Sequence, residues 1–328
     1  MPKIAPSILV GVTIVSMGVA QAQFATPGPG GFGVPPGRGV TRPAEPADDF
    51  DADVCNDIAS GPSPVMSLEA CRSMMGMQQR MQASSSDPNA VRPGDETLTC
   101  AGLLPRLADV TVLHVTDGAP RNSADAQRRG FTHWADYARA RRKELESAVA
   151  IAGIPAASMK SLGVPDQGAA MQLAMLTRAM LGFIAGAELV LTHAYEGGHP
   201  DHDAVAFAVA AARARMRGRA PLVLELPLYR HDVTVADDGA SGPGVALHLT
   251  QDERARKARM LAEFATQQEA LLGFGVRDEI YRIAPAHDFT QPPTEALYDS
   301  YDWGITGGRF AQLARAARGE LGLDSLRP

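Results

Sequence analysis

Short apolar runs typical of β-strands alternate with helical segments from residue 95 onward, and this alternation constrains the fold more than any other feature. Strands are expected at residues 110–115, 189–192 and 222–226, and helices at 134–152, 170–186 and 204–216. Strands separated by helices are joined by right-handed crossovers and lie parallel in one sheet. We therefore expect an α/β fold, a Rossmann-like three-layer domain with a mostly parallel sheet.

The last part of the domain is expected to be helical at two places. Thr250 and Glu253 have the spacing of a capping box, which predicts a long helix that begins there and ends near residue 274. A final helix is expected at residues 310–318. The formal net charge of -6 comes with scattered lysines and arginines, so the chain lacks a basic surface and nucleic acid is not an expected partner.

Residues 1–91 are expected to be a leader rather than part of the folded domain. Residues 1–22 have the features of a secretory signal, with an apolar core and the small-x-small site Ala20-Gln21-Ala22. That core is shorter than the about 20 residues needed to span a bilayer, so stable membrane insertion is not expected. Residues 23–91 are expected to form a Pro/Gly-rich linker and poorly ordered leader, and residues 92–328 the folded domain. Export to the periplasm or medium follows if the leader is authentic, and a cytoplasmic location otherwise.

The loop after the strand at 189–192 has the clearest chemical signature. Residues 193–203 hold three histidines and three carboxylates, beyond a strand end where ligands bind in open parallel sheets. His199 and His202 lie three positions apart at a helix start and share one face, so one can bind a metal while the other donates to a developing oxyanion. Asp201 is placed to orient either ring. A polar capping loop is the alternative interpretation.

Several motifs occur in an order that points to a known family. His-Pro-Asp-His stands at 199–202, Thr-Asp-Gly at 116–118 follows a strand, Arg142 and Glu144 share a helix, and Gly-Val-Pro-Asp stands at 163–166. From residue 95 to about 318 the chain thereby resembles the PIG-L/LmbE family of zinc-dependent N-acetylglucosaminyl deacetylases.

The resemblance implies a role for each matching residue of the second signature. His202 corresponds to a zinc ligand, and His199 to the histidine that acts on the tetrahedral intermediate or the leaving amine. Asp201 corresponds to the carboxylate that orients that histidine. Arg142 and Asp166 resemble positions that contact the sugar, with a surface helix charge and a loop cap as the respective alternatives.

The first family signature, His-Pro-Asp-Asp-Glu, is only half present. Residues 92–96 read Arg-Pro-Gly-Asp-Glu, so Asp95 matches the aspartate ligand of the metal. Arg92 stands where the ligand histidine belongs, and arginine does not bind zinc. Gly94 stands where the general base belongs. The apolar strand that precedes this signature in the family is also missing, because Pro88 and its polar neighbours do not form a central strand.

Three explanations of this departure are open. The segment before residue 92 is foreign or frame-shifted, or the chain is a degenerate member that binds sugars without hydrolysing them, or a substitute ligand such as His193 completes the site. The expected function is zinc-dependent removal of an N-acetyl group from an N-acetylglucosamine-type amino sugar or conjugate. The alternative is an inactive relative that binds carbohydrate. The expected partner is thus an amino sugar or a glycoconjugate.

Overall fold

A seven-stranded sheet lies at the centre of the part of the chain that the computed structural model describes, which is residues 8–9, 95–229, 244–271, 276, 278–293 and 295–323. The strand order is β3-β2-β1-β4-β5-β7-β6. The strands are β1 (Ile8–Leu9), β2 (Val110–Thr116), β3 (Met159–Val164), β4 (Leu189–His193), β5 (Leu222–Leu226), β6 (Gly244–Leu247) and β7 (Glu279–Ile283). Strands β1 to β5 pair in parallel, whereas β7 pairs antiparallel with β5 and β6. The predicted α/β class and mostly parallel sheet are confirmed.

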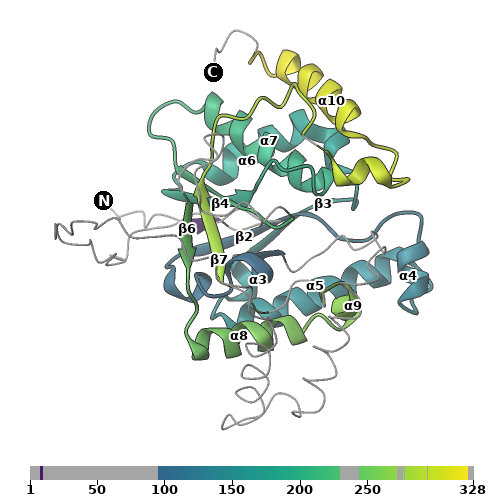
Figure 1. The fold of residues 1–328 in the computed structure, drawn as a ribbon, viewed down its shortest axis with the longest axis vertical. Helices are drawn as coiled ribbons and strands as arrows, with labels where there is room; N and C mark the ends of the chain where they lie inside the picture. Colours follow the sequence, from purple (N-terminus) through teal and green to yellow (C-terminus); the bar gives the residue numbers. More distant parts are fainter. Residues whose placement is uncertain are drawn as a thin grey trace, which may run out of the picture. The chain divides into compact units, whose positions relative to one another are not determined.

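Helices cover both faces of this sheet (Figure 1). One face carries α6 (Leu173–Ile184), α7 (Pro200–Arg215) and α10 (Gly307–Glu320), and the other carries α5 (Trp134–Ile151) and α8 (Gln251–Ala262). The shorter helices are α3 (Asp95–Cys100), α4 (Ala124–Arg128) and α9 (Gln268–Leu271).

The strands separate two hydrophobic clusters, because successive side chains point to opposite faces. Val190 packs with α6, α7 and α10, and its neighbour Leu191 packs with α5 and α8. Leu113 and Val112 on β2 divide in the same way. A strand covered on both faces is mainly apolar rather than alternating, which is why β2, β4 and β5 could be predicted from the sequence.

The helix that begins after Thr250 is shorter than predicted. The capping box is confirmed, since the Thr250 hydroxyl accepts from the Glu253 N–H and the Glu253 carboxylate accepts from the Thr250 N–H. Helix α8 nevertheless ends at Ala262, and a short 3₁₀ turn and α9 follow it. Phe264 leaves helical geometry with ψ of 63° and is fully buried. Burial of its ring accounts for the break.

The predictions of a secretory signal at 1–22 and a linker at 23–91 lie outside the described residues, apart from Ile8–Leu9. These two residues form β1 between β2 and β4, with Ile8 opposite Val110 and Leu9 opposite both Thr111 and Val190. The strand β1 is thus a neighbour of β4, which ends at His193 in the predicted site. Arg92 and Gly94 also lie outside the described residues. No helix of the described part is both long and apolar enough to cross a membrane.

Candidate metal centre

Three side chains with metal-binding atoms meet where β4 ends and α3 and α7 begin. They are Asp95 at the start of α3, His193 at the end of β4 and His202 in the first turn of α7. Their ligand atoms all lie within 4.8 Å of one another, and all three residues are buried. Asp95 Oδ2 lies 2.9 Å from His202 Nε2 and 3.9 Å from His193 Nε2. The two imidazole rings stack with centroids 3.7 Å apart.

His193 is buried, and its ring makes no hydrogen bond to the described part of the chain. Neither of its ring nitrogens has a hydrogen-bond partner among the described residues, and the residue is 1% exposed. Burial, together with the neighbouring His202, lowers the pKa of His193 well below its ordinary value. The ring is therefore neutral, which is the form of imidazole that binds metals. A buried polar ring without a partner costs free energy unless something else binds it.

His199 starts α7 as its N-cap. Its backbone is extended, and its Nδ1 accepts a hydrogen bond from the Asp201 N–H at 3.1 Å. Pro200 occupies the first helical position, where no N–H is needed. Because Nδ1 is an acceptor, the neutral ring carries its proton on Nε2. That ring is fully buried, packs against Trp303 with centroids 4.9 Å apart, and lies 5.3 Å from the His202 ring.

Asp201 holds the loop that carries Asp166. Its two carboxylate oxygens accept from the backbone N–H groups of Gln167 at 2.6 Å and Ala169 at 2.9 Å. Burial raises the pKa of Asp201 to about 7, although these two hydrogen bonds lower it. The carboxylate therefore positions a neighbouring loop, and the hydrogen bond that His199 accepts comes from the Asp201 N–H rather than from the predicted orienting carboxylate.

Asp166 is a buried acid that stands out among the described residues. Neither of its carboxylate oxygens has a partner among the described residues, and the residue is 5% exposed. Burial raises its pKa well above the ordinary value, and the neighbouring Asp201 adds to that effect, while Arg141 opposes it. An acid in this setting takes up a proton readily and is available to a hydroxyl-rich ligand.

The arginine next to Asp166 is Arg141 rather than Arg142. Arg142 is exposed and pairs with Glu146 one turn along α5, with Nε 2.8 Å from Oε1. Arg141 is 1% exposed, and its guanidinium donates to the Gly118 carbonyl oxygen. The helix phase distinguishes the two arginines, because Arg141 lies on the same face as the buried Tyr137 and Leu145. The spacing of those apolar residues is the sequence signal that identifies Arg141.

A buried ion pair anchors the turn after α3, and so the helix that carries Asp95. Lys257 Nζ lies 3.1 Å from Glu279 Oε1, and both side chains are fully buried. Glu279 also accepts from the Gly102 N–H at 2.8 Å and the Leu103 N–H at 3.2 Å. The pair thus ties α3 to α8 and β7.

A second buried carboxylate fixes the loop between β4 and α7. Asp203 accepts from the N–H groups of Glu196 and Gly197, both at 3.2 Å, and from the Tyr298 hydroxyl at 2.8 Å. Burial raises the pKa of Asp203 to about 8 despite these bonds. Gly197 has φ of +71°, a backbone conformation that favours glycine. His199 and His202 follow directly on this fixed loop.

The predicted residues of the two signatures come together in space. Asp95 and His202 are adjacent, and His199 and Asp201 lie on the same turn of α7. His193, which the sequence offered only as a substitute ligand, lies beside them. Arg142 lies apart from this group in an exposed ion pair.

Comparison with known proteins gave one family match and several structural similarities. A family model described as PIG-L, GlcNAc-PI de-N-acetylase, matches residues 93–213, which confirms the resemblance found in the sequence. The search of curated proteins found no match. The chain is similar to the A40926 pseudoaglycone deacetylase Dbv21 at 22% identity and TM-score 0.47, over 58% of this chain and 92% of that chain. It is also similar to the zinc-inhibited form of teicoplanin deacetylase Orf2 at 16% identity and TM-score 0.46, over 60% and 96% of the two chains.

Proposed function

We propose that this chain, which carries a PIG-L family domain at residues 93–213, is a metal-dependent hydrolase that removes an N-acetyl group from an N-acetylglucosamine-type amino sugar or conjugate. The observation that carries the proposal is the buried group formed by Asp95, His193 and His202. Two imidazoles and one carboxylate are a ligand set of catalytic zinc sites, so zinc is the proposed metal.

The three side chains fit a divalent cation in charge and in protonation. Asp95 supplies a carboxylate, and burial keeps the His193 ring neutral. Neither ring nitrogen of His193 has a hydrogen-bond partner among the described residues, so one of them is available to bind a metal. This geometry favours His193 as the substitute for the histidine missing at position 92. When bound, the metal would polarise the acetamide carbonyl and lower the pKa of a bound water toward about 7.

His199 is proposed to donate a hydrogen bond to the oxyanion of the tetrahedral intermediate. Its Nδ1 accepts from the Asp201 N–H, so the neutral ring keeps its N–H on Nε2, where it can stabilise that oxyanion. The N-terminus of α7, at which the ring lies, favours the negative charge that develops on the carbonyl oxygen. Trp303 packs on the ring and excludes water from that side.

Asp166 and Arg141 are proposed to bind the sugar. The Asp166 carboxyl has no hydrogen-bond partner within the described part of the chain, so both of its oxygens are available to sugar hydroxyls. Arg141 lies near enough to oppose the raised pKa of Asp166. We propose it in place of Arg142, because Arg142 is exposed and paired with Glu146.

A second candidate function follows from Gly94, which stands where the resemblance places a carboxylate base. Without that base the same pocket can bind an amino sugar and leave its amide intact. The protein would then be a carbohydrate-binding relative of the deacetylases, with Asp95 and His202 retained as metal or structural residues.

Metal analysis of the purified protein, combined with acetate release from N-acetylglucosamine conjugates, separates the two functions. The hydrolase proposal predicts stoichiometric zinc and acetate release. It also predicts that His199→Ala retains the zinc and loses acetate release, while the exposed His248→Ala keeps both. Zinc with no acetate release would support the binding function. The absence of both zinc and acetate release would reject the hydrolase.

Two further proposals concern the fold and the location. The sheet between two layers of helices supports a Rossmann-like three-layer domain.

Residues 1–22 support export, and cleavage after Ala22 would remove the two residues of β1. Mass spectrometry of the protein from its native host tests this proposal: an N-terminus at Gln23 supports export, and an intact N-terminus contradicts it.

A further inference from the structure

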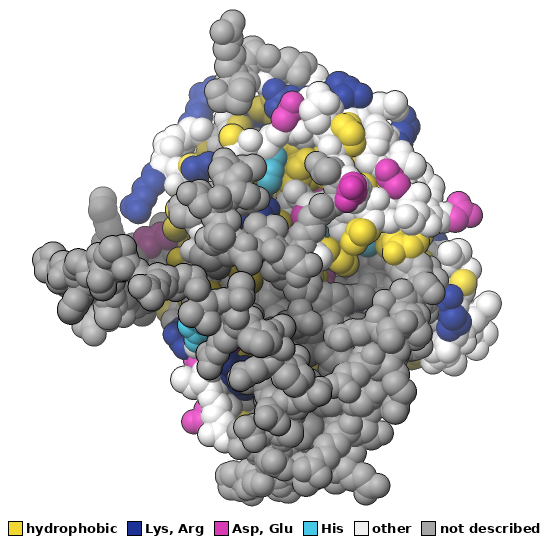
Figure 2. Space-filling model, in the orientation of Figure 1, with side chains coloured by type: hydrophobic (Ala, Val, Ile, Leu, Met, Phe, Trp, Pro, Cys, Tyr) yellow, Lys and Arg dark blue, Asp and Glu magenta, His cyan; other side chains and the backbone are white. Residues whose placement is uncertain are grey.

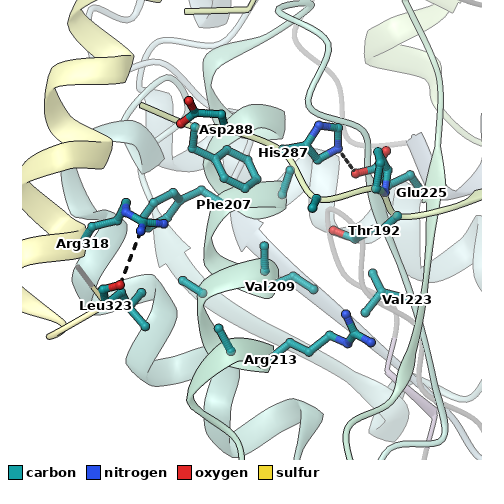
Figure 3. A pocket seen from close by; sticks show the side chains of 18 of the residues that line it. Thr192, Phe207, Val209, Arg213, Val223, Glu225, His287, Asp288, Arg318 and Leu323 are labelled. Carbon is teal, nitrogen blue, oxygen red and sulfur yellow. Dashed lines mark hydrogen bonds and ion pairs between the residues drawn. The ribbon is translucent and has the colours of Figure 1, made fainter. Parts of the chain in front are cut away.

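A cavity of about 710 Å³ lies between α7, β5 and the segment at 284–290 (Figure 3). None of the three proposed metal ligands lines it, although Thr192, the residue before His193, does. Its volume lies in the range of about 300–1,000 Å³ that is typical of small-molecule sites. The cavity is therefore large enough for a ligand separate from the substrate of the metal centre.

The walls of the cavity are mainly apolar. Small residues of α7 form one wall, and their short side chains leave the space open; they include Ala206, Ala210 and Ala214. Val223 of β5 and the buried Phe289 lie on other sides. Apolar walls favour a ligand with an aliphatic body, because transfer of that body from water is favourable.

A buried hydroxyl lies at the inner end of the cavity. Thr192 is 1% exposed, and its Oγ1 has no hydrogen-bond partner among the described residues. Figure 3 shows the Thr192 hydroxyl beside Glu225, with which it is paired on the neighbouring strand. A buried hydroxyl left unsatisfied costs free energy, so a polar group of a ligand would be bound favourably there.

The two acids that line the cavity already have partners. Glu225 is 2% exposed and pairs with Arg282, at 2.9 Å from Nε to Oε2, and with His287. Asp288 is exposed and accepts hydrogen bonds from the hydroxyl and the N–H of Thr290. Hydrogen bonds from Thr290, together with the nearby charges of Arg318 and Arg315, lower the pKa of Asp288, so arginines offset its charge as Arg282 offsets that of Glu225.

Arg213 supplies the unbalanced charge. It lies near the C-terminal end of α7, is exposed, and extends along the cavity toward Val223 (Figure 3). Within the ranges that the structure describes, no carboxylate pairs with its guanidinium. A guanidinium at the open side of an apolar cavity is suited to bind a carboxylate through charge-assisted hydrogen bonds.

We propose that this cavity binds an aliphatic carboxylate whose far end carries a hydroxyl group. The carboxylate pairs with Arg213 at the open side, the chain lies along the alanine face of α7, and the hydroxyl meets Thr192 at the inner end. The site is distinct from the metal centre, and its occupation does not depend on the proposed hydrolysis.

Calorimetric titration of the full-length protein with ω-hydroxydecanoate tests the proposal. We expect saturable binding that Ala210→Phe abolishes by filling the cavity. Ala316→Phe is the matched control, because Ala316 is an exposed alanine of α10 that does not line the cavity. Arg213→Gln is expected to weaken binding of ω-hydroxydecanoate about tenfold. It is expected to leave unchanged the binding of the α,ω-diol of decane, which has a hydroxyl in place of the carboxylate. Thr192→Val is expected to remove any preference for ω-hydroxydecanoate over decanoate.

Each outcome decides the proposal. Absence of saturable binding, or equal binding by wild type and Ala210→Phe, overturns the cavity as a ligand site. If Arg213→Gln weakens the diol as much as the carboxylate, the role of Arg213 is overturned. If Ala210→Phe does not fold, as judged by its circular dichroism, the Arg213→Gln comparison decides alone, because an exposed arginine is not needed for folding.

Discussion

Replacing Lys257 by methionine tests how the turn that follows α3 is held. Lys257 and Glu279 are both fully buried and lie 3.1 Å apart. Methionine has a similar length and no charge, so Lys257→Met keeps most of the packing and leaves the Glu279 carboxylate without a cation. The perturbation therefore isolates the charge rather than the volume of the side chain.

The expected cost follows from what Glu279 retains. Removing one partner of a buried ion pair costs about 3–5 kcal/mol, because the other charge is left uncompensated. Glu279 still accepts from the Gly102 N–H, the Leu103 N–H and the Tyr281 hydroxyl. These bonds stabilise the carboxylate, so we expect the lower end of the range, about 3 kcal/mol of unfolding free energy.

Urea unfolding of wild type and variants measures this cost. Adding Glu279→Gln to Lys257→Met is expected to recover part of the loss, because the buried charge is then removed as well. Lys143→Met, on the exposed side of α5, is the matched control and is expected to change stability by less than about 0.5 kcal/mol. A loss below about 1 kcal/mol for Lys257→Met, or no recovery in the double variant, would refute the reasoning.

Three further predictions concern interactions at or near the surface. Thr250→Ala is expected to lose about 1 kcal/mol in urea unfolding, because it removes the capping box of α8. Burial raises the pKa of Asp278, but the hydrogen bond from the Leu249 N–H and other contacts lower it below 3.8 overall. The native state then binds fewer protons than the unfolded state, so stability falls as the pH drops through the folded pKa, and Asp278→Asn should flatten the acid side of a plot of Tm against pH. Arg142→Gln breaks only an exposed pair with Glu146 and is expected to shift the urea midpoint negligibly.

Local sequence patterns predicted β2, β4 and β5, but not the central β1 or the strands β3, β6 and β7. The strands β2, β4 and β5 are mainly apolar, since helices cover both faces of the sheet. In contrast, β3 has only its first and last residues buried, and β6 is only partly buried or exposed. Such strands form because a neighbour supplies hydrogen bonds, and that pairing is not visible in a local pattern.

The site was predictable where it depends on neighbouring residues. His199 and His202 share one helix start, and the loop before them is polar and rich in glycine, so their position at a strand end follows from the sequence. The contact of His193 with Asp95 joins segments far apart in the chain, and no local pattern predicts it. Arg141 could have been identified, because it has the helical spacing of its buried neighbours on α5.

Zinc titration into metal-free protein tests the central claim most directly, which is that Asp95, His193 and His202 together hold the metal. The account predicts stoichiometric binding by the wild type and by His248→Ala, whose side chain is 83% exposed. It predicts that stoichiometric binding is lost in both His193→Ala and His202→Ala, with native circular dichroism in each. Wild-type zinc affinity in His193→Ala would contradict the account.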